Sequence, residues 1–305
     1  KSGISQARSR LSWHVMADLS AEVVRPIATG QTRGAWYQHW RIVSLDGTCF
    51  EVADEPANAE AFGYPGVSRG HAACPMLRCV SLLENGTRVL YASQIGPFRV
   101  GEVTLAQACV AQLSADSLCL ADRGFFGYRL WQAAQETGAQ LVWRLKSSNL
   151  RQREQDLPDG SYLSTLYPNA KARRANVQGL PVRVIEYRLG EQGDSDPPYR
   201  LVTTLLDPEQ APAQELAALY HQRWEIETAL GELKTHLKGR HTALRSKTPD
   251  LVRQEFYGYL MTYFAIRQVI HEAALHVERE PDRLSFINAV RVLRRKTPAS
   301  AAISP

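Results

Sequence analysis

The sequence of 305 residues has no long hydrophobic run, no internal repeat, no low-complexity tract and no cysteine pair at metal-ligand spacing. No apolar stretch approaches the roughly 20 residues that a membrane-spanning helix needs, and no signal peptide is visible. The cysteines are odd in number and contain no C-x-x-C pair, which disfavours a zinc site or a disulfide framework. Free thiols in a reducing cytosol are expected instead.

The overall composition, 44% apolar and 22% charged residues, is ordinary for a soluble globular protein. The length allows one large domain or two modest ones. The net charge of +5 is concentrated in residues 220–296, which hold 14 Lys and Arg against 9 Asp and Glu. A basic C-terminal third fits nucleic-acid contact, although a surplus of this size is common and also fits a solvated surface.

The most informative segment is residues 220–234, which read YHQRWEIETALGELK. At about 100° per residue, a helix would place four of its side chains within an arc of about 60°. These are Tyr220, Arg223, Glu227 and Lys234. A carboxylate held among cations suggests metal-assisted chemistry on a polyanion. The alternative is a set of ordinary surface ion pairs on an amphipathic helix.

A second stripe on the same segment is apolar and predicts that one edge of the helix is buried. It consists of Leu219, Ile226, Leu230, Leu233 and Leu237.

Two further acidic motifs precede this segment. Asp46 ends an apolar strand-like run and is followed by Gly47 and Thr48, where the Asp-Gly pair predicts a tight turn. Asp122 follows the short apolar run 117–121 and precedes Arg123 and a glycine. Taken alone, Asp46 is typical of a turn residue and Asp122 of a strand-end cap.

Together, the three motifs resemble the IS-four family of DDE transposases. The spacing Y-x2-R-x3-E-x6-K is reproduced without a gap at residues 220–234, and the Asp-Gly-Thr and Asp-Arg-Gly-Phe motifs occur in the family's order. The resemblance covers nearly the whole chain, from about residue 1 to about residue 296. It implies an RNase H-like α/β fold.

The resemblance also implies a catalytic triad of Asp46, Asp122 and Glu227 that holds two Mg²⁺ or Mn²⁺ ions. Two such ions about 3.5–4 Å apart activate the nucleophile and stabilise the leaving oxygen of a phosphodiester. Hard cations favour carboxylate oxygens, with water and phosphate filling the remaining positions. By analogy with related enzymes, Asp46 is expected to bridge both ions. The sequence offers no rival His/Cys/Asp cluster.

The expected contacts to DNA phosphates come from the same segments. Arg223 offers a planar fork and Lys234 a mobile point charge. The other candidates are Tyr220, Arg123, Lys238 and Arg240. For Tyr220 the alternative is simple packing beside Trp224, and for the basic stretch after the helix it is a solvated basic face.

Periodicity predicts a helix over 5–28, striped by Leu11, Val15, Leu19 and Val23, and a strand over 40–45 that returns over 48–52. Further expected strands cover 77–83, 88–95, 117–121, 140–146, 182–187 and 199–205. Expected helices cover 101–113, 128–137, the 220–234 segment and 250–277.

The expected architecture is an RNase H-like mixed sheet flanked by helices, with a mostly β insertion between the second Asp and the Glu. The expected boundaries are a helical remnant of an N-terminal region at 1–38, the first part of the core at 39–146, the insertion at 147–206, and the second part of the core with C-terminal helices at 207–305. Because the chain begins with Lys1 and family members usually carry a further N-terminal DNA-binding region, a fragment or processed product is expected.

The function that the resemblance implies is cut-and-paste DNA transposition through a hairpin intermediate. The implied partners are the terminal inverted repeats, target DNA and a second copy of the chain in a synaptic dimer, in the cytoplasm and nucleoid of a bacterium. A catalytically silent DNA-binding remnant or inhibitor is the main alternative. A junction resolvase is disfavoured because such enzymes are usually shorter and lack the 220–234 helix and the β insertion.

Overall fold

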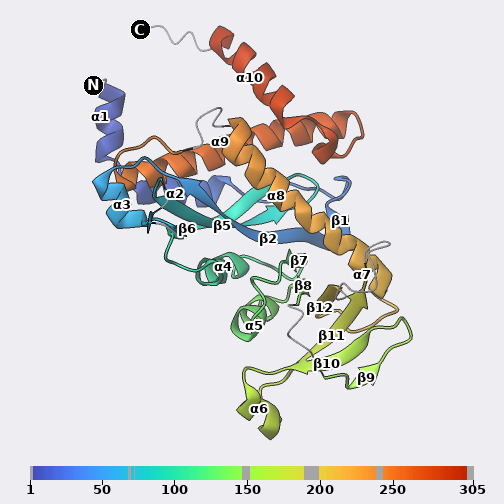
Figure 1. The fold of residues 1–305 in the computed structure, drawn as a ribbon. Helices are drawn as coiled ribbons and strands as arrows, with labels where there is room; N and C mark the ends of the chain where they lie inside the picture. The colour runs from blue at the N-terminus through green and yellow to red at the C-terminus, as the bar shows by residue number, and fades with distance from the viewer. Residues whose placement is uncertain are drawn as a thin grey trace.

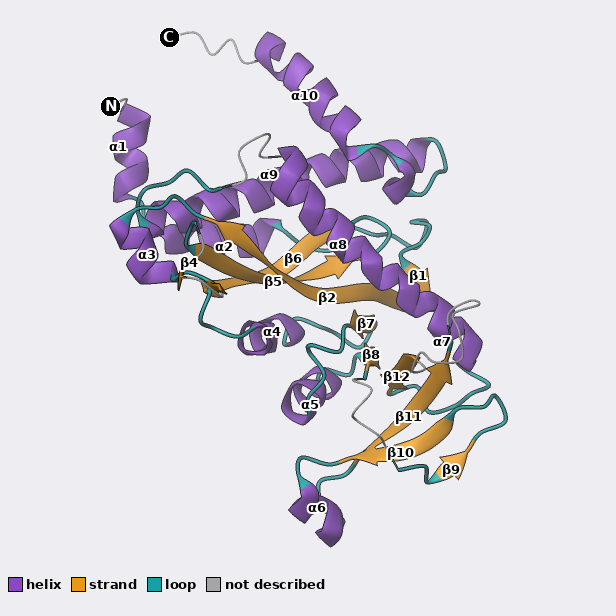
Figure 2. Ribbon diagram, in the orientation of Figure 1, coloured by secondary structure: helices purple, strands orange, loops and turns teal. Residues whose placement is uncertain are grey.

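The computed structural model describes residues 3–67, 70–71, 73–145, 152–188, 199–237 and 243–300. Its centre is a mixed sheet that helices cover on both faces (Figures 1 and 2). The strands of this sheet run in the order β6-β5-β2-β7-β8-β12-β11-β10-β9, and β1 pairs with β2 at one side. No helix in the described ranges has both the length and the apolar character needed to cross a bilayer.

The strands have these bounds: β1 Trp36–Tyr37, β2 Trp40–Glu51, β3 Gly66–Val67, β4 Gly70–His71, β5 Met76–Glu84, β6 Val89–Pro97, β7 Ser117–Ala121, β8 Gln140–Arg144, β9 Gln155–Asp156, β10 Tyr162–Leu166, β11 Leu180–Tyr187 and β12 Tyr199–Thr203. The helices are α1 Gly3–Arg10, α2 Trp13–Val23, α3 Pro56–Phe62, α4 Glu102–Val110, α5 Tyr128–Glu136, α6 Ala170–Ala175, α7 Ala213–Tyr220, α8 Trp224–Gly231, α9 Pro249–His276 and α10 Phe286–Ser300.

Strand β2 is the organising element of the sheet. It pairs antiparallel with β5 along most of its length and parallel with β7 over residues 41–45 only. Successive side chains of a strand point to opposite faces. Val43 and Leu45 accordingly pack with α4 and α5 on one face, whereas Phe50 and Val52 pack with α8 and α9 in a second cluster.

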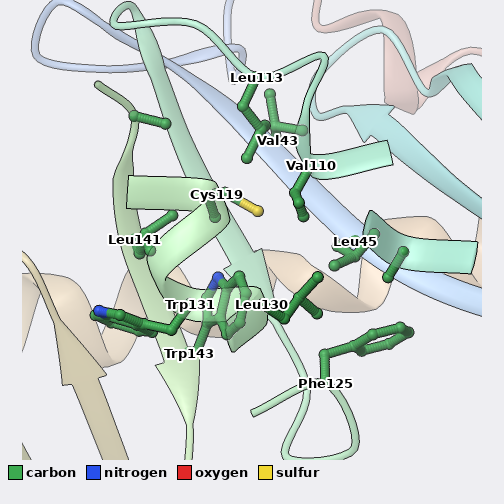
Figure 3. Close-up of a cluster of buried hydrophobic side chains, with 14 of the residues drawn as sticks. Val43, Leu45, Val110, Leu113, Cys119, Phe125, Leu130, Trp131, Leu141 and Trp143 are labelled. Atoms are coloured by element: carbon green, nitrogen blue, oxygen red, sulfur yellow. The ribbon is translucent and has the colours of Figure 1, made fainter. Parts of the chain in front are cut away.

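The first of these cores contains two tryptophans that contact each other edge to face. The Trp131 and Trp143 ring centroids lie 5.3 Å apart, with an interplanar angle of 82°. Figure 3 shows this cluster between β7, β8 and helix α5, with Leu45 and Val43 of β2 beside it. The fully buried rings fix the position of β7, the strand that ends at Asp122.

One expected turn is absent from the structure. Asp46 and Gly47 lie in the middle of β2, where they pair with Ser81 and Val80 of β5. The Asp-Gly turn of a tight hairpin requires positive φ angles, and Gly47 is not among the residues with positive φ. The pairing with β5 therefore overrides the local turn preference, and the expectation of two strands separated by a turn is wrong.

The expected N-terminal helix is also divided. It breaks between α1 and α2, where the Ser12 hydroxyl accepts a hydrogen bond from the His14 amide and caps α2. The apolar stripe that predicted this helix is exposed, because Leu11, Val15 and Leu19 are 40%, 49% and 44% accessible. The neighbouring face of α2, with Trp13 and Met16, packs against α9 instead.

The β-rich segment after residue 147 extends the main sheet. β12 pairs antiparallel with β8, and β11, β10 and β9 follow in order. The short helix α6 lies at the outer end of this extension (Figure 1). In the described part of 147–206, strands predominate and α6 is the one helix, which agrees with the expected β content.

The helical path over residues 213–237, here called the signature helix, departs twice from the α-helical pitch. It runs through α7, a 3-10 turn at His221–Arg223, α8 and a π-helical segment at Glu232–Leu237. The apolar stripe expected on it is buried, including Ile226 and Leu233 at 0% and 1% exposure. Figure 1 shows the signature helix crossing over β2 on one face of the sheet.

Candidate active site

Two aspartates lie next to each other because β2 and β7 run in parallel. The last pair in their register is Leu45 with Ala121, and each strand continues directly into an aspartate. Asp46 and Asp122 therefore lie side by side at the carboxyl end of the stretch in which β2 and β7 are paired. The carboxyl ends of parallel strands are the usual location of ligand sites in α/β sheets.

Each aspartate is held by a neighbouring backbone amide. Gly47 N donates to Asp46 Oδ1 at 2.7 Å, and Arg123 N donates to Asp122 Oδ1 at 2.6 Å. One oxygen of each carboxylate thus remains for other partners. At Gly47 an added Cβ would lie 3.1 Å from the Glu102 side chain, so glycine allows α4 to approach the strand closely at this point.

The third carboxylate reaches the pair through an arginine. Arg223 donates from Nη2 to Glu227 Oε1 at 2.9 Å and from Nη1 to Asp46 Oδ2 at 3.2 Å. The Arg223 side chain is 8% exposed, and the Glu227 side chain is 41% exposed. The ion pair between Arg223 and Asp46 joins residues 177 positions apart in the sequence. The alternative of ordinary surface ion pairs within one amphipathic helix therefore does not account for Arg223.

Burial raises the pKa of Asp46 to about 6. The Gly47 amide and the Arg223 guanidinium act in the opposite direction, whereas the charges of Glu227 and Asp122 raise the pKa further. Because burial is the largest cause and the charges of Glu227 and Asp122 add to it, the ionised form of Asp46 is disfavoured in spite of Arg223. Such a site favours an additional cation.

The oxygen donors at this edge fit a hard divalent cation. Aspartate and glutamate oxygens are the ligands that Mg²⁺ and Mn²⁺ accept, usually completed by water and substrate phosphate. In the described part of the chain, no three His, Cys, Asp or Glu side chains converge closely enough to hold one ion. The guanidinium of Arg223 lies between Asp46 and Glu227 and forms an ion pair with each of them.

Lys234 lies on the π-helical segment and points back to β2. Its Nζ donates to Thr48 Oγ1 at 3.1 Å and lies 5.9 Å from the centroid of the Phe50 ring. Lys234 therefore reaches the strand two residues beyond Asp46. The role of Thr48 in orienting the ammonium was not recognised from the sequence, although it belongs to the Asp-Gly-Thr motif.

Tyr220 is buried, with 5% exposure, and its hydroxyl lies 3.4 Å from the carbonyl oxygen of Ala121. Burial raises its pKa. In this conformation the tyrosine anchors the end of α7 against β7, immediately before Asp122. This burial agrees with the alternative of a packing role for Tyr220, whereas the Trp224 indole is 58% exposed and contacts the Arg223 guanidinium.

Three further residues are expected to contact DNA, namely Arg123, Lys238 and Arg240. The Arg123 side chain is exposed beside Asp122. Lys238 and Arg240 lie outside the described residues.

Sequence reasoning missed a polar support behind the 3-10 turn. Asn85 donates from Nδ2 to the Gln222 carbonyl at 2.9 Å, and its Oδ1 accepts from the Ser44 hydroxyl at 2.9 Å. This buried amide ties the turn that carries Arg223 to the strand that carries Asp46. Its only sequence signal is an Asn-Gly turn, which predicts a hairpin and nothing about the site.

A second missed feature lies at the π-helical segment. Glu232 is 7% exposed and forms ion pairs with Arg267 of α9 and, at 3.6 Å, with Arg88. The hydroxyl of Tyr263 donates to Glu232 Oε2 at 3.0 Å. These contacts hold the helix turn that presents Lys234. No motif reveals them, because the partners come from two other parts of the sequence, Arg88 and helix α9.

The chain belongs to the transposase DDE domain family, whose family model matches residues 39–265. More particularly, it is 28% identical, over its whole length, to the transposase InsG for insertion sequence element IS4 of Escherichia coli, and it covers 69% of that protein. The resemblance to the IS-four family of DDE transposases is thereby confirmed.

Two further relatives match about half of the chain. The putative transposase InsZ of Escherichia coli is 27% identical over 48% of the chain, and the putative transposase y4zB of Sinorhizobium fredii is 29% identical over 48%. These matches cover 49% and 40% of the two relatives.

Among solved structures, the chain is similar to the piggyBac transposase in a cryo-EM structure of its synaptic complex with hairpin DNA. The TM-score is 0.51 at 10% identity, and the match covers 86% of this chain and 55% of the other. This likeness concerns the fold, and it confirms the expected RNase H-like mixed sheet flanked by helices.

Proposed function

We propose that this protein is a DNA transposase that cleaves and joins DNA strands with the carboxylates of Asp46, Asp122 and Glu227. The observation that carries the proposal is the meeting of three elements far apart in sequence. The parallel pairing of β2 with β7 ends just before Asp46 and Asp122, Arg223 of the signature helix links Asp46 to Glu227, and the charges of Glu227 and Asp122 both act on Asp46. Membership of the transposase DDE domain family supports the same reaction class.

In the proposed active state, Asp46, Asp122 and Glu227 would hold two Mg²⁺ or Mn²⁺ ions. The ions supply Lewis-acid activation of the attacking oxygen and charge stabilisation of the leaving oxygen. Arg223 then exchanges its contacts to Asp46 and Glu227 for a substrate phosphate, to which its planar fork can bind through two hydrogen bonds. Charge neutralisation at the acids and at the phosphate would be coupled through this one side chain.

Lys234 is proposed to neutralise a DNA phosphate beside the carboxylates. Its contact with a neutral hydroxyl, Thr48, leaves its charge uncompensated by an acid within the described residues. Arg123, Lys238 and Arg240 are proposed to contact the backbone further along the duplex. For Tyr220, the hydrogen bond to Ala121 supports a positioning role in the strand end before Asp122 over direct contact with phosphate.

The proposed reaction sequence is cut-and-paste transposition. A first nick frees a 3′-hydroxyl at the element end, this hydroxyl attacks the opposite strand to form a hairpin, and the reopened end joins target DNA. The same carboxylates serve each phosphodiester exchange. The proposed partners are terminal inverted repeats, target DNA and a second copy of the chain in a synaptic dimer. The bacterial origin of the relatives supports the cytoplasm and nucleoid as the place of action.

The experiment that tests the proposal is excision of the element from a donor plasmid. The complete reading frame with its native flanking DNA is compared with Glu227→Gln, Asp46→Asn and Asp122→Asn, each expected to abolish metal-dependent excision while DNA binding persists. Glu225→Gln is a matched control, because this acid lies on the same helix but pairs with Arg88. Its excision should be close to that of the unchanged protein.

Normal excision by any one of the three variants would remove that residue from the triad. DNA binding without excision by the unchanged protein would instead support the silent remnant or inhibitor.

A further inference from the structure

A cluster of three cations lies at the outer end of the β-rich segment. Lys171, Arg173 and Arg174 are exposed side chains of α6. None of them forms an ion pair with another described residue. The stretch between Asp159 and Glu186 contains no acidic residue. Glu154, which lies across a small polar hollow from Arg173, accepts a hydrogen bond from the Thr165 hydroxyl at 3.0 Å.

The helix that presents these cations is firmly built despite its six residues. The Asn169 side chain caps its start by accepting a hydrogen bond from the Ala172 amide at 2.9 Å. Asn176 ends it in the left-handed conformation, with φ of 50°, and accepts a hydrogen bond from the Tyr167 hydroxyl at 2.6 Å. The cations are therefore presented in a defined arrangement on a capped helix.

The turn after α6 is packed against the strand that leads to it. A Cβ added to Gly179 would lie 2.7 Å from the Thr165 methyl group and 2.9 Å from the Tyr167 ring. Only glycine permits this approach of the backbone. The turn is therefore tightly packed beside the helix that carries Lys171, Arg173 and Arg174.

The cations are connected to the candidate active site by α5. The Tyr128 hydroxyl in the first turn of α5 donates to the Gln178 carbonyl at 2.8 Å, in the turn beside α6. The next residue, Arg129, is exposed, as is Arg123 beside Asp122. Exposed cations therefore occur next to Asp122 in the sequence, in the first turn of α5 and on α6.

The length of β11 sets the distance between α6 and the signature helix. Its far end, Tyr187, contacts His221 with ring centroids 6.2 Å apart. Eight residues of strand at about 3.3 Å each span roughly 23 Å. That distance corresponds to about 7 base pairs of DNA at 3.4 Å per pair.

We propose that Lys171, Arg173 and Arg174 form a second contact site for the phosphate backbone of double-stranded DNA, separated from the signature helix by the length of about 7 base pairs. The inference rests on the proposed function, since the DNA that lies in the active site is the DNA that reaches α6. The contact is made to phosphates, because Lys and Arg side chains on an exposed surface supply the sequence-independent contacts that position a protein on a duplex.

The test measures equilibrium binding without divalent ions, so that no DNA is cut. The probes are a duplex of about 12 base pairs centred on the cleavage site and the same duplex extended by about 10 base pairs on each side, which exceeds the reach estimated from the strand spacing. The triple variant Lys171→Ala, Arg173→Ala, Arg174→Ala retains helix-favouring residues. The matched control, Arg25→Ala, Arg33→Ala, Arg99→Ala, removes three exposed cations elsewhere.

The unchanged protein and the control are expected to bind the extended duplex more tightly than the short one, and the triple variant is expected to lose most of that gain. Its plot of log affinity against log salt should be shallower by about 0.9 for each lost phosphate contact. If all three contacts are lost, the ratio of the affinity of the unchanged protein to that of the triple variant should be roughly fortyfold smaller at about 200 mM salt than at about 50 mM. An unrelated duplex of equal length should show the same difference.

Equal salt slopes and an undiminished length effect in the triple variant would overturn the proposal. A loss confined to the element's own terminal sequence would also overturn it, because backbone contacts are independent of sequence. A triple variant that binds DNA normally but no longer self-associates would assign α6 to a second copy of the chain. Because cleavage is not measured, failure of the excision experiment and failure of the α6 contact remain distinguishable.

Discussion

The two ends of the signature helix are each held by a fully buried arginine, but the two arginines are neutralised in different ways. Arg183 of β11 lies at the N-terminal end and Arg267 of α9 at the C-terminal end, and both are 0% exposed. Burial lowers the pKa of Arg183. Burial acts in the same direction on Arg267, but Tyr263 and Glu232 outweigh it and raise that pKa.

The partners explain the difference. Arg183 donates mainly to neutral groups, including the Ser161 hydroxyl at 2.7 Å and the Ala211 carbonyl at 2.7 Å. Its acidic partner, Asp159, also accepts from the Ala213 amide at 2.8 Å, the first residue of α7. The charge of Asp159 therefore has donors besides the arginine, and its side chain is 22% exposed to water.

At the other end, Glu232 depends far more on its arginine. Its side chain is 9% exposed, and besides Arg267 it has the Tyr263 hydroxyl and the more distant Arg88. Removing a partner from a buried ion pair leaves an uncompensated charge in a medium of low dielectric constant. The two ends should therefore respond unequally to the same loss of an arginine.

The largest expected effect follows from Arg267→Met. We expect a loss of about 3–5 kcal/mol in the free energy of unfolding, since Glu232 is left buried without its main partner. Denaturant unfolding followed by circular dichroism measures it. The double variant Glu232→Leu, Arg267→Met should recover most of the loss, because no charge remains to be buried. A double variant as unstable as the single one would show that the arginine stem, not the ion pair, stabilises this end.

Arg183→Met is expected to cost less, about 1–3 kcal/mol, which is the range for leaving buried hydrogen-bond acceptors unsatisfied. Asp159 retains its Ala213 contact and some hydration. Here the corresponding double variant, Asp159→Asn with Arg183→Met, should not recover stability, because the carbonyl groups remain without donors. Recovery at this end as complete as at the Arg267 end would remove the distinction between the two arginines.

Sequence patterns predicted most elements of the fold but not these supports. The strand before Asp122 matches its predicted bounds of 117–121, and the hairpin of β5 and β6 and the buried stripe of the signature helix were also predicted. These features depend on local periodicity. Arg183 looked like an ordinary polar position in an alternating strand, because its partners lie 22 to 28 positions away.

The candidate site was predicted through its motifs, whereas its geometry was not. The Asp-Gly pair favours a turn locally, and only the pairing of β2 with β5 keeps Asp46 within a strand. The ideal helix assumed for residues 220–234 gives no sign of the 3-10 turn at Arg223 or of the π-helical segment at Lys234. Both irregularities coincide with side chains that reach β2, which agrees with the frequent occurrence of π segments at functional sites.

Lys234→Ala tests whether the end held by Arg267 is also the end that contacts DNA. Lys234 lies on the same π-helical segment as Glu232, the partner of Arg267. Because the variant loses one phosphate contact, we expect its DNA affinity to fall and the slope of log affinity against log salt to become shallower by about 0.9. Fluorescence anisotropy over a range of salt concentrations measures both. Lys247→Ala is the control, since that ammonium is 77% exposed and pairs with Glu55. Identical slopes for the two variants would argue against a phosphate contact by Lys234.

The smallest expected effect concerns His271, one turn beyond Arg267 on α9. Its Nε2 lies 2.8 Å from the Thr32 hydroxyl, and burial lowers its pKa although Glu84 and Glu272 act in the opposite direction. Like Arg183, it is a buried group whose positive form lacks sufficient compensation. Because the folded pKa is below the unfolded value of about 6.5, its stabilising contribution is complete above that pH and is lost as the pH falls.

Thermal unfolding of the unchanged protein and of His271→Gln between about pH 7.5 and about pH 5.5 measures this contribution, since that window spans the unfolded pKa of histidine. The unchanged protein should lose more stability on acidification than the variant, in which the glutamine remains neutral. Arg267 is charged throughout the range and gives no such dependence. If acidification stabilised the unchanged protein relative to His271→Gln, the carboxylates Glu84 and Glu272 would dominate over burial, and His271 would belong with Arg267 rather than with Arg183.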